Sequence, residues 1–133
     1  MKINLFFSVF ILGFASFAYG QQTKEISTID FVQIVDGNED EAIFYYQNNW
    51  KILREMAVKK KYIKSFQILK TEASEETPFH LILITTYANK KKYAKREENF
   101  AKVIKEKGDL ELLNDKKPNE FRKTLFRKES AEY

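Results

Sequence analysis

Two adjacent asparagines lie within an aromatic, helix-forming segment, AIFYYQNNWKIL (42–53). On a helix with about 100° per residue, Asn48 projects away from the apolar side, whereas Asn49 falls within an apolar arc beside Tyr46 and Ile52. A buried amide without a hydrogen-bond partner costs about 1–3 kcal/mol, so Asn49 needs a partner. That partner is a ligand, a pocket water or a group of the protein itself, and the first alternative makes Asn49 a ligand-binding residue.

A second helical segment carries two charges on its apolar side. Arg96 and Glu97 lie on either side of Phe100 in projection, within an arc that also holds Val103. A guanidinium group binds carboxylates through two parallel N–H donors, and Arg96 is therefore a candidate ligand-binding residue for a carboxylate or phenolate. Glu97 would act as a base or neutralise Arg96. The alternative is that the stem of Arg96 packs while its head stays in water.

The single histidine, His80, stands at the start of a predicted strand. An imidazole suits general-base chemistry near neutral pH, so His80 and Glu97 are the catalytic candidates. The alternative for His80 is a surface side chain or one that the protein itself hydrogen-bonds. The predicted ligand-binding set is Asn49, Trp50, Arg96, Tyr46 and Tyr87. We expect Asn49, Arg96 and the Trp50 ring to approach one cavity between the two helices and the sheet.

The composition argues against several kinds of site. With one histidine and no cysteine, no metal-ligand spacing stands out, and we predict neither a metal nor another cofactor. The sequence contains no glycine-rich phosphate loop, no G-x-S-x-G turn and no Ser-His-Asp candidate set. A formal net charge of +4, without a track of basic and aromatic residues, argues against nucleic acid as a partner.

The N-terminus has the layout of a secretory signal peptide. A positive residue and an apolar run precede Ala18-Tyr19-Gly20, whose small residues place a cleavage point before Gln21. The alternative is an uncleaved anchor, because the uncharged run is about as long as the roughly 20 residues that a membrane span needs. We expect residues 1–20 to be removed and residues 21–133 to form one domain. The product is then exported, periplasmic or extracellular, without stable membrane insertion.

The rest of the chain alternates between β-rich and helix-rich segments. Apolar periodicity and turn residues predict strands at 26–35, 64–72, 79–87 and 121–129, and helices at 40–61 and 89–108. Asn38 or Asp40 is the candidate N-cap of the first helix, and Gly108 ends the second. The order β-α-β-β-α-β is the split arrangement of ferredoxin-like α+β folds.

The strand FHLILITTY (79–87) is apolar on both sides. One row begins Phe79, Leu81 and Leu83, and the other holds Ile82 and Ile84. Two helices cover one face of a four-stranded sheet, so the other face would expose an apolar patch, and such patches mark interaction sites. We expect a homodimer that packs sheet against sheet. The alternative is that the C-terminal segment folds over that face.

The element order, the helix YYQNNWKILREMAVKKKYIKSFQIL and the passage ILITTYANKKKYAKREENF resemble the dimeric α/β-barrel proteins. These include small antibiotic-biosynthesis monooxygenases, EthD-like proteins and NIPSNAP-like proteins, and the resemblance covers residues 28–128. It implies two ferredoxin-like protomers whose sheets form a barrel, each with a pocket between sheet and helices. The Asn/Trp/His set of the haem-degrading members has no match, because Trp50 lies on the first helix and His80 on a strand.

Three functions fit these observations. The first is an exported binding or interaction module for a small organic ligand. The second is a cofactor-independent monooxygenase or isomerase acting on a small aromatic or carbonyl compound, with Asn49, His80, Arg96 and Glu97 as its polar groups. The third is an accessory protein without a pocket. The fold alone does not choose among them.

Overall fold

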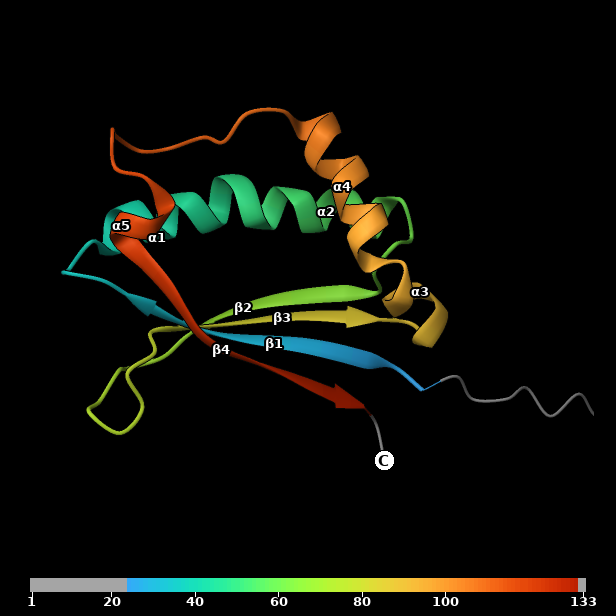
Figure 1. Cartoon of the computed structure of the whole chain (residues 1–133), viewed down its shortest axis with the longest axis horizontal. Coiled ribbons are helices and arrows are strands. Elements are labelled where there is room, and N and C mark those ends of the chain that lie inside the picture. Colours follow the sequence, from blue (N-terminus) through green and yellow to red (C-terminus); the bar gives the residue numbers. More distant parts are fainter. Residues whose placement is uncertain (1–23, 132–133) are drawn as a thin grey trace, which may run out of the picture.

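The computed structural model describes residues 24–131, so the predicted signal peptide, residues 1–20, lies outside the described residues. The elements are β1 (Ile26–Ile34), α1 (Glu39–Tyr45), η1 (Tyr46–Trp50), α2 (Lys51–Lys59), β2 (Ser65–Lys70), β3 (Leu81–Tyr87), α3 (Lys90–Ala94), α4 (Arg96–Lys107), α5 (Pro118–Phe121) and β4 (Arg122–Ala131). Because α1, η1 and α2 form one continuous helix, the predicted order β-α-β-β-α-β is confirmed (Figure 1).

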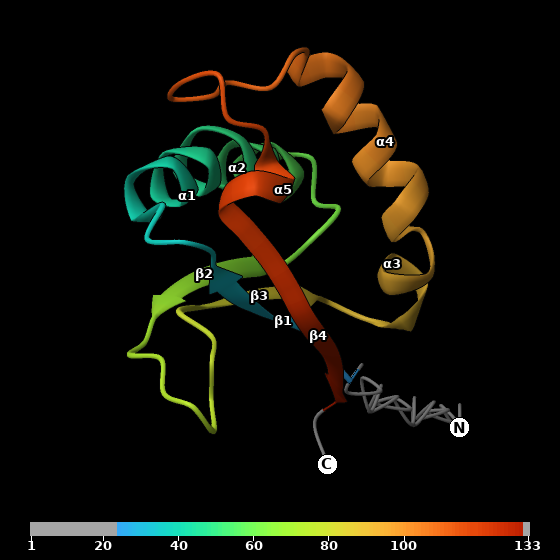
Figure 2. The ribbon, with the colours of Figure 1, turned by 60° about the vertical axis from the view of Figure 1, so that its left-hand side comes forward.

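The four strands form one sheet in the order β2-β3-β1-β4. Each strand is antiparallel to its neighbours, so β1 and β2 run parallel with β3 between them. The long first helix and α4 lie on the same side of this sheet (Figures 1 and 2). The molecule therefore has the two layers, helices over a single sheet, that the sequence predicts.

The first helix begins with three acids, Glu39, Asp40 and Glu41, which favour the positive end of the helix dipole. Asn38 precedes it, as predicted for an N-cap, but makes no side-chain cap. Its amide donates instead to the Val35 carbonyl at 2.8 Å and so stabilises the preceding turn.

The segment Tyr46–Trp50 of this helix is π-helical. A π turn contains more residues than an α turn, and it therefore changes the direction in which later side chains point. Ile52, predicted to face inward, is 36% exposed, whereas Arg54 is mostly buried. The projection at a constant angle per residue is thus wrong for Ile52, whereas Ala57, which was also predicted to face inward, is fully buried.

The second predicted helix is two helices. Lys95, with φ −90° and ψ 6°, separates α3 from α4. The Asn89 side chain caps α3 by accepting from the Lys92 N–H at 2.8 Å. Gly108 ends α4 with φ 86°, a left-handed conformation that glycine adopts without strain. The predicted end of this helix is therefore confirmed.

Residues 109–117, here called the strap, connect α4 to α5 by running back across the first helix (Figure 1). Two of its side chains hold Glu41 of α1: Lys116 at 2.9 Å and Asn114 at 3.1 Å. The C-terminal part of the chain before β4 therefore packs on the helix layer. It does not cover the opposite face of the sheet, which was the alternative considered for this segment.

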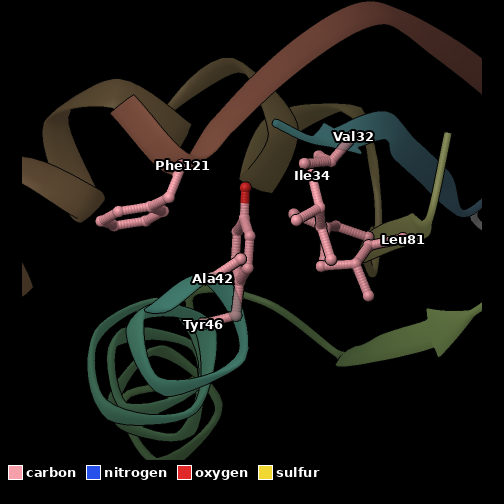
Figure 3. Packing of buried hydrophobic residues seen from close by; sticks show 7 residues of the cluster. Val32, Ile34, Ala42, Tyr46, Leu81 and Phe121 are labelled. Atoms are coloured by element: carbon pink, nitrogen blue, oxygen red, sulfur yellow. The ribbon is translucent and has the colours of Figure 1, made fainter. Parts of the chain in front are cut away.

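The core lies between the first helix and the sheet. One cluster joins strand, helix and α5 residues around the Tyr46 ring (Figure 3): Val32, Ile34, Ala42, Tyr46, Leu81, Leu83 and Phe121. A second cluster of Ala57, Ile63 and Tyr87 lies nearer the other end of the sheet. Leu81, Leu83, Thr85 and Tyr87 are all buried, so this row of β3 faces the helices.

The other face of the sheet, here called the open face, carries a cluster of apolar side chains. It carries Ile29, Phe31, Phe79, Ile82, Ile84 and Phe126. The Phe31 ring stacks on Phe126 at 4.5 Å and meets Phe79 edge-on at 4.9 Å. Phe79 was predicted to share the row of Leu81, but it precedes β3 and turns to the opposite face.

Candidate ligand-binding cleft

A cleft of about 170 Å³ opens between α4 and the helix-facing side of the sheet. Its walls come from β1, α2, β3, α4 and β4, and its lining is Thr28, Arg54, Tyr87, Arg96, Glu97, Phe100 and Arg127. Three residues singled out in the sequence, Tyr87, Arg96 and Glu97, therefore come together here. Arg54, Arg127 and Thr28 were not predicted to take part.

Arg54 occupies the inner wall of the cleft. Its guanidinium carbon lies 4.1 Å from the centre of the Trp50 ring and 4.5 Å from that of Phe100, so aromatic rings cover it. Its Nε donates to the Thr85 hydroxyl at 3.4 Å. Burial lowers the pKa of Arg54 to about 10, which still leaves the group charged at neutral pH.

Arg127 on β4 forms a two-bond ion pair with Asp30 on β1. Its Nε and Nη2 donate to the two carboxylate oxygens at 2.5 and 2.9 Å. Asp30 is 8% exposed and lies in the buried row of β1, where an unpaired carboxylate would be costly. The hydrogen bond to Asp30 raises the pKa of Arg127, so this guanidinium group is charged at neutral pH.

Arg96, at the start of α4, lies at the mouth of the cleft. Its guanidinium stacks over the Tyr93 ring at 4.2 Å, and Nη1 donates to the Tyr93 carbonyl at 3.2 Å. The Tyr93 hydroxyl in turn bonds the Glu129 carboxylate on β4. These contacts hold the Arg96 guanidinium beside Tyr93, where the residue lines the cleft.

Tyr87 ends β3 and is 3% exposed. Burial raises the pKa of its hydroxyl, and the positive charges of Arg54, Arg96 and Arg127 oppose that rise. The burial effect is the larger, so the phenol stays protonated at neutral pH and can donate a hydrogen bond. Tyr87 therefore lines the cleft together with three guanidinium groups that act on its hydroxyl.

The remaining candidates lie elsewhere. Asn49, 1% exposed, bonds only groups of the protein: it accepts from the Glu111 N–H at 2.8 Å and Lys107 Nζ at 3.0 Å, and donates to the Glu111 carbonyl at 2.7 Å and the Tyr45 carbonyl at 3.1 Å. Of the three residues expected to share a cavity, Arg96 lines the cleft, Trp50 supports it through Arg54, and Asn49 holds the strap.

Tyr46 and His80 also lie outside the cleft. Tyr46 belongs to the core and borders a separate groove beside β2, lined by Ile43, Tyr46, Gln47, Lys51, Phe66, Gln67 and Ile68. His80 precedes β3, about 20 Å along the strand from Tyr87. Its Nδ1 accepts from the Ile34 N–H at 3.0 Å and so extends the pairing between β1 and β3. His80 is therefore hydrogen-bonded within the protein, which was the alternative to a catalytic role.

Sequence reasoning missed Arg54, Arg127 and Asp30 for identifiable reasons. Arg54 follows Trp50 by one helical turn, but the π segment turns it inward. Asp30 is the only charged residue of β1 and lies in its inward row, and a charge there was the available signal for a partner. Its partner could not be named because β4 shifts register against β1 next to Phe31.

Among residues 24–131, no group of three or more histidine, cysteine or carboxylate side chains could hold a metal ion. In the same part of the chain, no helix combines the length and the apolar character that crossing a membrane requires.

No protein-family profile matches the chain, and neither does any curated protein sequence. Among solved structures, the chain is similar to HapK from Hahella chejuensis, with a TM-score of 0.54 and 10% identity over 81% of this chain and 92% of HapK. A candidate chlorite dismutase, TA0507, is matched at a TM-score of 0.45 and 11% identity over 82% of this chain and 44% of that protein.

The likeness to HapK shows the fold. The chain is a ferredoxin-like α+β domain, which confirms the predicted fold class. With 10% identity, the likeness carries no residue role from HapK to this chain. The evidence for a function therefore lies in the residues that line the cleft.

Proposed function

We propose that this protein is an exported binding module that holds a small organic ligand in the cleft between α4 and the sheet. One observation carries the proposal. Side chains from α2, β3 and α4 line one cleft, and some of their hydrogen-bonding groups have no partner among residues 24–131. These groups are the terminal nitrogens of Arg54, whose Nε alone bonds Thr85, and the hydroxyl of Tyr87. Polar groups that line a cleft in this way can fix the orientation of a ligand.

Native mass spectrometry tests this function. The mature protein, purified without denaturation, should carry a small organic molecule that is released on unfolding. If it is purified empty, a panel of single-ring carboxylates, phenols and carbonyl compounds should include binders that raise its melting temperature, since a ligand of the folded state stabilises it by mass action. A protein that carries no ligand and responds to none of the panel contradicts the proposal.

Self-association through the open face is part of the same proposal. The open face holds aliphatic and aromatic side chains from all of β1, β3 and β4, and Phe126 is 45% exposed. Exposed apolar patches mark interaction surfaces in soluble proteins. A second copy presents the same patch, so a twofold arrangement would bury both at once.

A cofactor-independent isomerase or monooxygenase is the second candidate, and Tyr87 is the observation that favours it. A protonated phenol beside guanidinium groups would stabilise an enolate formed from a carbonyl compound. Asp30 forms an ion pair with Arg127. The base in this scheme would therefore be the more exposed Glu97. Turnover of a carbonyl compound that is lost in Glu97→Gln, with binding retained, would establish the enzyme. If the unsubstituted protein and Glu97→Gln bind the compound equally and neither turns it over, the protein is a binding module and not an enzyme of this kind.

A further inference from the structure

We infer that the ligand of the cleft is a small organic carboxylate, and that Arg54 is the residue that binds its carboxylate group. This inference rests on the proposed function and names the chemistry of its ligand. Three features of the cleft support it: the donors of Arg54 that have no partner, the charge of the cleft and its size.

The first step concerns the donors. Trp50 and Phe100 lie against the Arg54 guanidinium, so its remaining interactions must be made in the plane of the group. In that plane only Nε has a partner, the Thr85 hydroxyl. Within residues 24–131, Nη1 and Nη2 have no hydrogen bond, and the group has no salt bridge. Two parallel donors in one plane match a carboxylate.

The second step concerns charge. The cleft contains three guanidinium groups, and its nearest buried carboxylate, Asp30, is already bound on both oxygens by Arg127. Glu97 is exposed at the rim and forms no salt bridge with a described residue. A mostly buried cation without a counter-ion is costly, as the lowered pKa of Arg54 reflects. An incoming anion removes that cost, whereas a neutral ligand does not.

The third step concerns size and the other walls. The cleft volume of about 170 Å³ is below the roughly 300–1,000 Å³ of sites for drug-sized ligands, so a ligand with a single ring or a short chain is favoured. Phe100 supplies an apolar wall for such a group. Tyr87 and Arg96 add donors to the lining of the same cleft. The arrangement suits a carboxylate with a compact apolar body rather than a bare inorganic anion.

Trp50 provides a direct signal for binding. It is the only tryptophan in the chain, and its ring lies against Arg54. Benzoate is the probe, benzamide is its neutral counterpart of nearly equal shape, and inorganic phosphate tests a bare oxyanion. We expect benzoate to change Trp50 fluorescence in a saturable way and to bind about tenfold or more tightly than benzamide or phosphate, because a charge-assisted pair is lost with either.

The variant test uses Arg54→Met, with Arg122→Met as the matched control. Arg122 is also an arginine stacked on an aromatic ring, Tyr45 at 4.8 Å, but it lies outside the cleft. Arg54→Met should weaken benzoate binding by about tenfold or more and leave benzamide unchanged. Arg122→Met should leave both unchanged. Arg54→Lys, which keeps the charge but loses the two-donor fork, should weaken benzoate binding by a smaller factor, and it serves if Arg54→Met does not fold.

The outcomes separate the two levels of the proposal. Equal affinity for benzoate and benzamide, with no effect of either Arg54 variant, overturns the inference and leaves the binding module standing. Phosphate binding as tight as benzoate binding overturns the organic part of the inference. A cleft that binds no member of the wider ligand panel, charged or neutral, overturns the proposed function itself.

Discussion

The side-chain amide of Asn49 pairs with the backbone of Glu111, 62 residues further along the chain, through two hydrogen bonds. Its oxygen accepts the Glu111 N–H at 2.8 Å and its nitrogen donates to the Glu111 carbonyl at 2.7 Å, as a backbone partner in a sheet would do. The strap is thereby fastened to η1 by a residue that is 1% exposed. Lys107 binds the same oxygen at 3.0 Å and fixes the end of α4 as well.

Asn49→Leu should lower the free energy of unfolding by about 2 kcal/mol, because both backbone groups of Glu111 lose their bond to a buried amide. Asn48→Leu is the matched control: its amide only donates to the Phe44 carbonyl within the same helix, and it is less buried. Urea denaturation of both variants measures the difference. Equal losses in the two proteins would contradict a specific role for Asn49.

The sequence was sufficient for much of this arrangement. Alternation in the strand that became β3 distinguished its two rows, and the buried row is the one that includes Leu81, Leu83 and Tyr87. The inward position of Asn49 also followed from helical periodicity, because it depends only on residues close by. The partner of Asn49 could not be predicted from periodicity, because the strap has no periodic pattern that would place Glu111.

The cleft was predictable only in part. Arg96, Glu97 and Tyr87 lie on elements whose faces could be projected, and they do meet. Arg54 could not be found, since its direction depends on the π segment before it, and a constant angle per residue cannot describe that segment. The Asp30–Arg127 pair depends on the register between two strands far apart in the sequence, which a bulge changes.

The link between Glu41 and the strap should be pH-dependent. The hydrogen bond from Lys116, assisted by Asn114, lowers the pKa of Glu41 to about 2. A carboxyl group whose pKa is lower in the folded state stabilises the fold above its unfolded pKa, near 4.5, and loses this contribution as the pH falls towards 2. The stability difference between the protein and Glu41→Gln should therefore be constant from pH 5 to 7 and shrink below about 4.5.

Urea denaturation at several pH values measures that difference. Glu98→Gln is a control on a solvent-exposed pair, because Glu98 binds Lys102 within α4 and does not touch the strap. Its effect on stability should be smaller at every pH, since exposed pairs on one helix contribute little. A Glu41→Gln effect that is the same at pH 3 as at pH 7 would contradict the assigned contact.

Replacing Ile82 with lysine should convert a dimer into monomers. Ile82 lies in the row of β3 that faces away from the helices, between Phe31 of β1 and Leu69 of β2. A lysine there would have to be buried without a partner at the centre of the interface. Ile104→Lys is the control, because Ile104 is also an exposed aliphatic residue, at 52%, but lies on α4. Light scattering at micromolar concentration reads the mass, and a monomeric unsubstituted protein would contradict the dimer.

Export should leave Gln21 as the first residue of the mature protein. This follows from the apolar run and the small residues at Ala18 and Gly20, which lie outside the described residues. Intact-mass measurement on protein recovered from outside the cytoplasm checks it, with allowance for cyclisation of Gln21 to pyroglutamate. A mass that still includes residues 1–20 would contradict cleavage and support the anchor that was the alternative.

The pH profile of benzoate binding tests whether a guanidinium group, rather than a histidine or a carboxylate, carries the affinity. Arg54 is positively charged below a pKa of about 10, and a bound anion would raise that pKa further. Benzoate is an anion throughout the range above pH 6. The affinity should therefore be constant from pH 6 to 9 and should begin to fall only as the pH approaches 10.

The same property of Arg54 predicts the stability of its variants. Because its pKa is lower in the folded state than in the unfolded chain, the unfolded state binds the proton more tightly and the charged group opposes folding at neutral pH. Arg54→Met removes this cost and keeps most of the apolar stem, so without ligand its melting temperature should not fall. Trp50 fluorescence titrations and thermal denaturation measure the two effects. An affinity that changes between pH 6 and 8, or an unliganded Arg54→Met protein that melts far below the parent, would show that Arg54 is a structural residue and that another group binds the anion.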